Sequence, residues 1–275
     1  MLGRFVKECR PKTSQQKIRA GMVCVFALAT LTGSAIDCTG QSRTEDAAKT
    51  GAGNLDAQTT AETMEQLVGV RDAFVQRIAA VGLNCAIAPP NILIQPVPSF
   101  GNYDPATNTL QTPAWQQLTT EERGLFFRLA GPGANEDAAR HFFETGTHRW
   151  VFMHEMGHWW QACRHISQEQ QHYRIEYGAN RIAAAYWREA DPEILAIMAP
   201  AFEHSFSSMP NPVPAGQSAE KYLDDNYERL GPTPAYRWYQ SRMIVAINEE
   251  KPAPSFLQAL QDAGKEKMLT PSAEK

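Results

Sequence analysis

Two histidines, His154 and His158, are four residues apart in a stretch whose apolar pattern predicts a helix. At this spacing both imidazole rings project from the same helical face, so their nitrogens can converge on one point. Glu155 lies one step further round the helix, close to that point. If the H-E-x-x-H motif over residues 154–158 binds a metal, this segment must be helical and the face with both histidines must point toward the rest of the fold.

The motif resembles the one that zinc peptidases carry on their active-site helix. A site that activates water also needs a third protein ligand. In metzincins this ligand is a histidine six residues after the second motif histidine, but here Arg164 occupies that position and Gln161 replaces the motif glycine. Cys85 is not preceded by the glycine of the deformylase cysteine ligand. Neither of these families matches, and two helical histidines that only pack in a core are the alternative.

The remaining candidate for a third ligand is Glu176, eighteen residues after His158 on a second predicted helix. With this spacing the chain resembles the gluzincin branch of the zincin metallopeptidases, which includes thermolysin-like and aminopeptidase-like enzymes. The resemblance implies a Zn²⁺ ion bound by His154, His158 and Glu176. Thermolysin-like members carry an acidic residue four positions after the glutamate, where this chain has Asn180, which can accept an imidazole hydrogen bond without adding charge. An exposed helical carboxylate is the alternative role of Glu176.

The resemblance also implies a mechanism, in which Glu155 is the general base toward the attacking water. The oxyanion that forms needs a further donor, which related folds take from a histidine or a tyrosine. Tyr227 is slightly preferred over His204, and Tyr222 and Tyr236 are further candidates. Each of these four side chains can equally have a structural role.

The rest of the chain predicts an α+β fold, with a small sheet ahead of packed helices. A first amphipathic helix is expected to end near Gly82, and residues 92–94 form an edge strand between prolines. A hairpin is expected over residues 100–112, with its turn at 104–108. A similar hairpin lies ahead of the active-site helix in zincins, where the edge strand can bind an extended substrate.

After Pro113 the pattern is helical. One long helical stretch over residues 136–162 contains the motif and is expected to break near Gly146. A further helix is expected over residues 168–189, and several prolines divide the remainder of the chain.

Residues 1–35 have the order of a secretory signal peptide, with a basic leader, a short apolar run and small residues at the end. Residues 36–60 are small and polar, which predicts a disordered tether before a zincin-like domain over residues 61–265. We therefore expect a secreted or periplasmic protein. An uncleaved N-terminal membrane anchor is the alternative.

Cleavage after residue 35 would leave 20 basic and 29 acidic residues and would move the formal net charge from −4 to −9. An acidic protein is a poor candidate for binding nucleic acid or an anionic membrane. The expected partner is a peptide or protein substrate, without stable membrane insertion after cleavage. In an oxidising compartment Cys85 and Cys163 could form a disulfide, although two buried thiols are an equal alternative.

Two other functions compete with an exported zinc peptidase, namely a non-catalytic zinc-binding domain and a membrane-anchored interaction protein whose N-terminal segment is not cleaved, and a di-iron site competes with the zinc site. A non-catalytic zinc-binding domain on a zincin-like scaffold could act in binding or at the cell envelope, but a purely structural site has no need for Glu155. A di-iron bundle would use Glu155 with His158 and Glu169 with His172. The fourteen residues between those pairs leave little room for two long facing helices and a turn.

Overall fold

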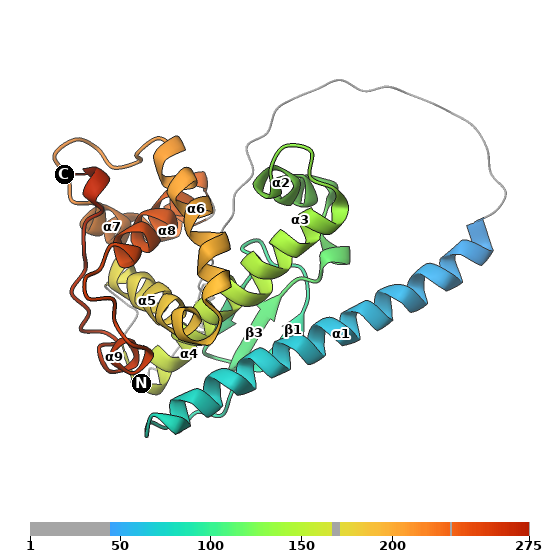
Figure 1. Ribbon diagram of the computed structural model, residues 1–275, viewed down its shortest axis with the longest axis horizontal. Coiled ribbons are helices and arrows are strands. Elements are labelled where there is room, and N and C mark those ends of the chain that lie inside the picture. The colour runs from blue at the N-terminus through green and yellow to red at the C-terminus, as the bar shows by residue number, and fades with distance from the viewer. Residues whose placement is uncertain (1–44, 167–170, 232, 275) are drawn as a thin grey trace, which may run out of the picture.

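The computed structural model describes residues 45–166, 171–231 and 233–274. Within these ranges the fold is α+β, as predicted, with a three-stranded sheet followed by packed helices (Figure 1). The expected signal segment, residues 1–35, and residues 36–44 of the expected tether lie outside the described residues.

The first helix, α1, spans Glu45–Ala80 and runs beside the sheet (Figure 1). Its core-facing side chains, Leu67, Val70, Phe74 and Ile78, recur at helical spacing and are buried. The structure differs from the tether expected over residues 45–60, which are helical here. A scarcity of large apolar side chains limits burial, but the alanine, glutamate and glutamine in this stretch favour a helix.

The sheet has the strand order β1-β3-β2, with β1 at Asn91–Ile94, β2 at Asn102–Asp104 and β3 at Thr109–Thr112. The hairpin of β2 and β3 is confirmed, and so is the edge position of β1, which pairs in parallel with β3. Asp104 stabilises the hairpin turn, because its carboxylate accepts hydrogen bonds from the Ala106 N–H and the Thr107 hydroxyl at 2.9 and 2.8 Å. β2 is the other edge of the sheet and contacts the motif helix.

A 3₁₀ turn, η1 at Trp115–Gln117, and helices α2 (Thr120–Ala130) and α3 (Glu136–Phe143) follow the sheet. Thr119 caps α2 together with Glu122 in a capping box. Aromatic side chains of these elements pack with Phe100, from the loop before β2, in a small separate core that includes Trp115, Phe126 and Phe143.

The motif helix is reached without the expected break near Gly146. Residues Glu144–Val151 continue α3 as a π-helix, η2, and α4 then spans Phe152–Cys163. π-Helical turns are rare and often lie at functional sites. Every residue of α4 from Phe152 to Gln161 is buried, so α4 lies inside the molecule and not on its surface.

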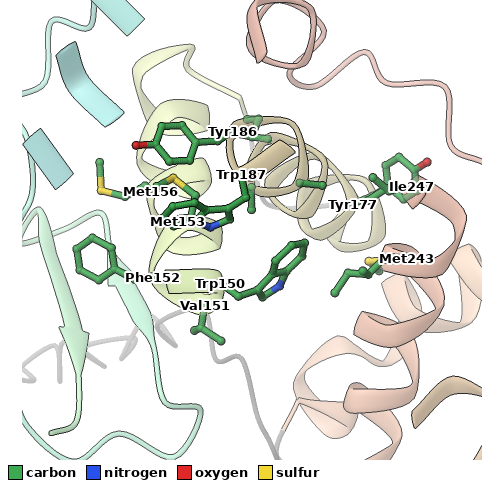
Figure 2. Close-up of a cluster of buried hydrophobic side chains, with 14 of the residues drawn as sticks. Trp150, Val151, Phe152, Met153, Met156, Tyr177, Tyr186, Trp187, Met243 and Ile247 are labelled. Carbon is green, nitrogen blue, oxygen red and sulfur yellow. The ribbon is translucent and has the colours of Figure 1, made fainter. Parts of the chain in front are cut away.

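Helix α5 (His172–Ala190) packs against α4, α6, α7, α8 and α9 and forms the centre of the helical half. The later helices are α6 (Pro192–Ser208), α7 (Ala219–Leu230), α8 (Pro234–Asn248) and α9 (Phe256–Gln261), with a last turn, η3, at Ser272–Glu274. Figure 2 shows part of the core, where Trp150 of η2 and Met153 of α4 meet side chains of α5 and α8. Among the described residues, no helix has both the length and the apolar character needed to span a bilayer.

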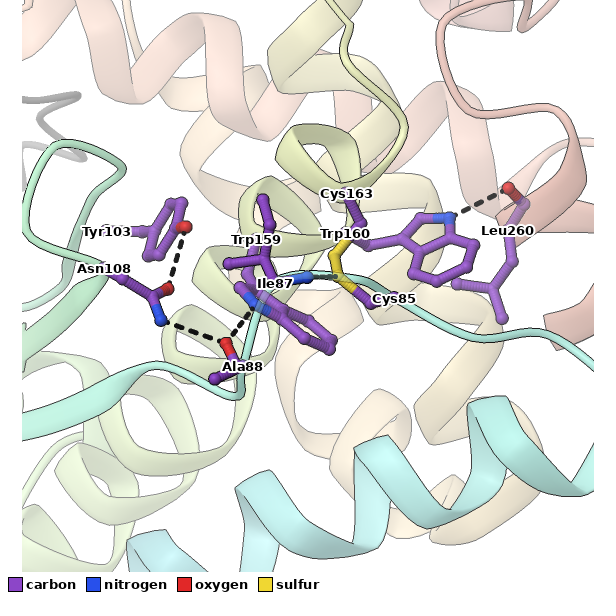
Figure 3. Close-up of a disulfide and its surroundings, with 9 residues drawn as sticks. All are labelled: Cys85, Ile87, Ala88, Tyr103, Asn108, Trp159, Trp160, Cys163 and Leu260. Carbon is purple, nitrogen blue, oxygen red and sulfur yellow. Dashed lines mark hydrogen bonds between the residues drawn. A yellow bond between two sulfur atoms is a disulfide. The ribbon is translucent and has the colours of Figure 1, made fainter.

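A disulfide joins Cys85 to Cys163, with the Cα atoms 5.3 Å apart (Figure 3). It connects the loop before β1 to the C-terminal end of α4. Close by, the Ala88 carbonyl accepts hydrogen bonds from the Trp159 indole N–H at 2.9 Å and from the Asn108 amide at 3.0 Å. The pairing that the sequence left open is therefore formed, and it attaches the sheet to the motif helix.

Candidate metal centre

Three potential ligands meet in the core: His154 and His158 from α4 and Glu176 from α5. Their ligand atoms all lie within 4.8 Å of one another. The two histidine Nε2 atoms are 2.9 Å apart. Glu176 Oε2 lies 3.2 Å from His154 Nε2 and 3.8 Å from His158 Nε2. None of the three side chains is more than 2% exposed. Within the described residues, this is the only cluster of three such groups.

The distance between α4 and α5 depends on Gly157, the fourth residue of the motif. A Cβ built on Gly157 would lie 2.9 Å from the Ala179 Cα and 3.1 Å from the Ala179 carbonyl oxygen. Real Cβ atoms essentially never approach other atoms so closely, so a larger residue would push the helices apart. A glycine at this position therefore allows Glu176 to reach the histidines.

The far nitrogen of each histidine faces a side-chain amide. His154 Nδ1 is 3.0 Å from Asn180 Oδ1, the contact that the sequence suggested. His158 Nδ1 is 2.8 Å from Gln161 Oε1. These partners orient both imidazole rings with Nε2 toward Glu176.

The orientation of both amides follows from their second contacts. The Gln161 amide N–H donates to the Ile175 carbonyl at 2.8 Å, and the Asn180 amide N–H donates to the Glu176 carbonyl at 3.0 Å. A carbonyl can only accept, so each amide must direct its nitrogen to the main chain and its oxygen to the imidazole. Both imidazoles therefore carry a proton on Nδ1, and Nε2 of each ring is the nitrogen that faces the cluster.

Both oxygens of Glu176 also accept hydrogen bonds, from the Tyr227 hydroxyl to Oε1 at 2.9 Å and from the Gln240 amide to Oε2 at 2.8 Å. Gln240 in turn accepts a hydrogen bond from Asn180 at 2.7 Å. His172 stacks on the ring of Tyr227 with centroids 3.9 Å apart. The carboxylate is thus oriented by residues from α7 and α8 as well as by its own helix.

Glu155 is connected to the sheet. It is 1% exposed, and its Oε2 accepts a hydrogen bond from the Tyr103 backbone N–H of β2 at 2.8 Å. Gly101 allows this approach, because a Cβ there would lie 2.4 Å from Val151 Cγ1 and 3.3 Å from Glu155 Cγ. The sheet edge and the motif helix therefore together define the position of this carboxylate.

The charges in the cluster are strongly coupled. Burial alone would lower the pKa of His154, but the hydrogen bond and charge of Glu176 and the charge of Glu155 raise it overall. Burial and the neighbouring His154 lower the pKa of His158 to about 3. Burial would raise the pKa of Glu176, yet the two histidines lower it to about 2. The cluster therefore supplies an ionised carboxylate and a neutral imidazole in the protein interior.

Of the further candidates, Tyr227 contacts the cluster and its hydroxyl is 3.5 Å from that of Tyr236. Tyr222 bonds instead to Arg229 on α7 at 2.9 Å. His204 lies on α6, where it lines a different cavity together with Arg237. The structure therefore leaves His204 outside the site. The exposed face of α6 that carries His204 borders the same cavity as α2.

Three residues of the site were not expected from the sequence, namely Gln161, Gln240 and Tyr103. Gln161 lies three residues after His158, so helical spacing could have indicated it. Gln240 and Tyr103 come from distant segments, and Tyr103 contributes a backbone N–H that carries no signal in the sequence. Compared with models of known families, with curated proteins and with solved structures, the chain has no match in any of the three comparisons.

Proposed function

We propose that the chain is an exported zinc-dependent metallohydrolase that cleaves peptide bonds, on a zincin-like fold of the gluzincin type. The observation that carries this proposal is the convergence of His154, His158 and Glu176 in a buried cluster, with every far nitrogen and carboxylate oxygen bonded to a fixed partner. The proposed partner is a peptide or protein substrate and not nucleic acid.

The donor set fits zinc. Two imidazole nitrogens and one carboxylate oxygen are the ligands of hydrolytic zinc sites with an open fourth position, whereas Ca²⁺ and Mg²⁺ prefer oxygen ligands. Nε2 of both rings faces Glu176 because both Nδ1 atoms are engaged by amide oxygens, so Nε2 is the atom that each histidine would offer to the metal. Without a cation, two nitrogens 2.9 Å apart in the interior are stabilised only by shared protons and the carboxylate.

When bound, zinc supplies a Lewis acid that polarises a scissile carbonyl and lowers the pKa of a water molecule toward about 7. Glu155 accepts the proton of the attacking water and then delivers it to the leaving amine nitrogen. The Glu155 carboxylate lies close enough to His154 to raise the pKa of that imidazole. The Tyr103 N–H orients the carboxylate by a hydrogen bond. Burial of the whole cluster strengthens these electrostatic effects.

Tyr227 is the proposed donor to the oxyanion, in preference to His204. Its single hydroxyl proton is donated to Glu176 Oε1 in this structure, so stabilising the oxyanion requires that the proton turn from this carboxylate oxygen to the substrate oxygen; the hydroxyl of Tyr236 is 3.5 Å away. Tyr227 therefore also positions the carboxylate ligand.

A non-catalytic zinc-binding domain is the second candidate function. A domain of this kind would need the same three ligands and hydrogen-bond partners as the proposed hydrolase. It would not need the buried carboxylate of Glu155. Burying an acid beside a metal site costs free energy, and this cost has a function only if the group transfers protons.

The metal is tested first, by elemental analysis of the purified mature protein. We expect about one zinc per chain, which is lost in His158→Ala and Glu176→Ala. Matched controls are His141→Ala and Glu228→Ala, which change the same residue types at exposed positions. Absence of zinc from the wild-type protein, or zinc that is indifferent to Glu176, would contradict the proposed ligand set.

Catalysis is tested with Glu155→Gln and a library of fluorogenic peptides. The amide is nearly isosteric but cannot accept the water proton, so we expect zinc to be retained and hydrolysis to fall by at least about 10²-fold. A variant that retains both zinc and the full hydrolysis rate would exclude Glu155 as the base. A wild-type protein that binds zinc but cleaves no peptide would favour the non-catalytic domain.

Export is proposed from the leader in the sequence, and mass spectrometry of the exported protein tests it. We expect an N-terminus near residue 36. An intact Met1 would instead support the N-terminal anchor.

A further inference from the structure

A second hollow lies away from the metal cluster, where α2, α3, the π-helical turn, α6 and α8 meet. It has an inner chamber of about 40 Å³ and an adjoining outer depression of about 460 Å³. The two parts share five lining residues: Leu129, Phe142, Ala201, Ser205 and Arg237. None of the proposed zinc ligands lines either part, so the hollow is a distinct feature.

The inner chamber is almost entirely apolar, with walls formed by Phe126, Met198 and Phe202 among others. Three residues with hydroxyl groups also line it: Thr147 from the π-helical turn, Ser205 from α6 and Ser241 from α8. Thr147 and Ser241 are at most 1% exposed, and among the described residues neither of these two hydroxyl oxygens has a hydrogen-bond partner. Buried polar groups are normally bonded, so these two hydroxyls indicate a site that can accept a ligand.

The outer part is positively charged. Arg128 and Arg237 line it together with His204, and none of the described residues that line either part is an aspartate or glutamate. Among the described residues, neither arginine has a carboxylate within 4 Å, and the Arg237 Nε contacts only the Met209 sulfur at 3.3 Å. Burial and the nearby Arg128 lower the pKa of Arg237, which is the result expected where a guanidinium lacks a counter-charge.

Arg237 is half-buried and Arg128 is exposed, and the two buried arginines among the described residues differ from them in having counter-charges. Arg181 forms ion pairs with Glu250 and Asp262, both at 2.8 Å. Arg242 forms ion pairs with Glu274 and Glu220, at 2.9 and 3.2 Å. The chain has more acidic than basic residues, so an arginine pair without a carboxylate is not the result of a shortage of acids.

We infer that this hollow binds a small apolar carboxylic acid, with its carboxylate between Arg128 and Arg237 and its apolar body against the aromatic wall of the inner chamber. Arginine binds carboxylates through paired hydrogen bonds, and pockets of this kind take an apolar ligand body and one polar group. The inner chamber is small, so it takes only the end of the apolar body, and the rest of the ligand lies in the adjoining outer depression. This inference does not depend on the proposed hydrolysis.

Titration calorimetry with octanoate tests the site on the purified mature protein, with octanol and octylammonium as neutral and cationic probes of the same length. We expect one octanoate per chain, at least tenfold weaker binding of octanol and no binding of octylammonium. Arg237→Gln and Arg128→Gln should each weaken octanoate by about tenfold or more. Arg229→Gln, at an exposed arginine of α7, should have no effect.

Arg128 is exposed, so its variant tests the charge even if Arg237→Gln disturbs folding. Ala201→Trp tests the cavity, because Ala201 lines both parts and a bulky side chain there should abolish octanoate binding while zinc content and hydrolysis are unchanged. Equal binding of octanol and octanoate, no octanoate binding at millimolar concentration, or octanoate binding that survives both arginine changes would each overturn the inference.

Discussion

Gly157 packs against the backbone of Ala179, and a Cβ on the glycine would lie 2.9 Å from the Ala179 Cα. This contact joins the helix with the two histidines to the helix with Glu176. The residue between Met156 and His158 has no ligating group of its own, yet it determines whether the three ligands can meet.

Replacing Gly157 with alanine should therefore lower zinc affinity, even though alanine is the better helix former. We expect at least a tenfold weaker affinity in competition with a chromophoric chelator, because the added methyl group separates α4 from α5. Gly69→Ala in α1 is the control, since a Cβ there meets nothing within 4 Å and the change should raise the free energy of unfolding by about 0.4–1 kcal/mol. Unchanged zinc affinity in Gly157→Ala would mean that the helix spacing does not limit the site.

Gln161→Leu should weaken zinc binding while the fold is retained. The amide holds the His158 ring through Nδ1 at 2.8 Å, and partners of this kind typically contribute 10–100-fold to metal affinity. The same chelator competition measures the effect, with Gln217→Leu at an exposed loop position as the control. If zinc affinity is unaffected, the ring must be oriented by packing alone.

Tyr227→Phe removes the hydrogen bond to Glu176 Oε1. Hydrogen bonds to charged groups contribute about 1.5–3 kcal/mol, so the free energy of unfolding of the metal-free protein should fall by about that amount in urea titrations. Hydrolysis should also fall through kcat, with KM little changed, if the hydroxyl donates to the oxyanion. Tyr222→Phe, whose hydroxyl contacts only Arg229 among the described residues, should change neither quantity.

Cys85→Ser with Cys163→Ser should lower the free energy of unfolding by about 2–5 kcal/mol, because the disulfide closes a long loop of 78 residues. Urea unfolding of the double variant beside the oxidised protein measures this difference. Reduction of the wild-type protein should give the same loss, whereas a loss seen only in the double variant would indicate a packing effect of the serines.

The sequence predicts the parts of the site that depend on helical spacing. His154, His158 and Asn180 follow from single helical turns, and the structure brings them together with Glu176. The hairpin and the start of α2 follow from turn and capping residues whose conformations are local.

The remainder depends on contacts between distant segments. Gln240 reaches Glu176 across 64 residues, and the Tyr103 N–H reaches Glu155 across 52. No local pattern encodes such pairs, which is also why the sequence favours Tyr227 over His204 only slightly. The tether expected over residues 45–60 is helical for another reason. Composition indicates how much surface a segment can bury, and it does not measure the tendency of an alanine-rich segment to form a helix.

The π-helical turn over residues 144–151 sets the rotational phase between α3 and the ligand-bearing helix. Each residue added to or removed from a helix turns everything beyond it by about 100°. A one-residue change in the length of this turn would leave the motif and α4 intact while changing the direction in which both imidazoles project relative to Glu176. The rotation of α4 relative to α3, and with it the direction of both imidazoles, is therefore determined by a stretch that contributes none of the proposed ligands.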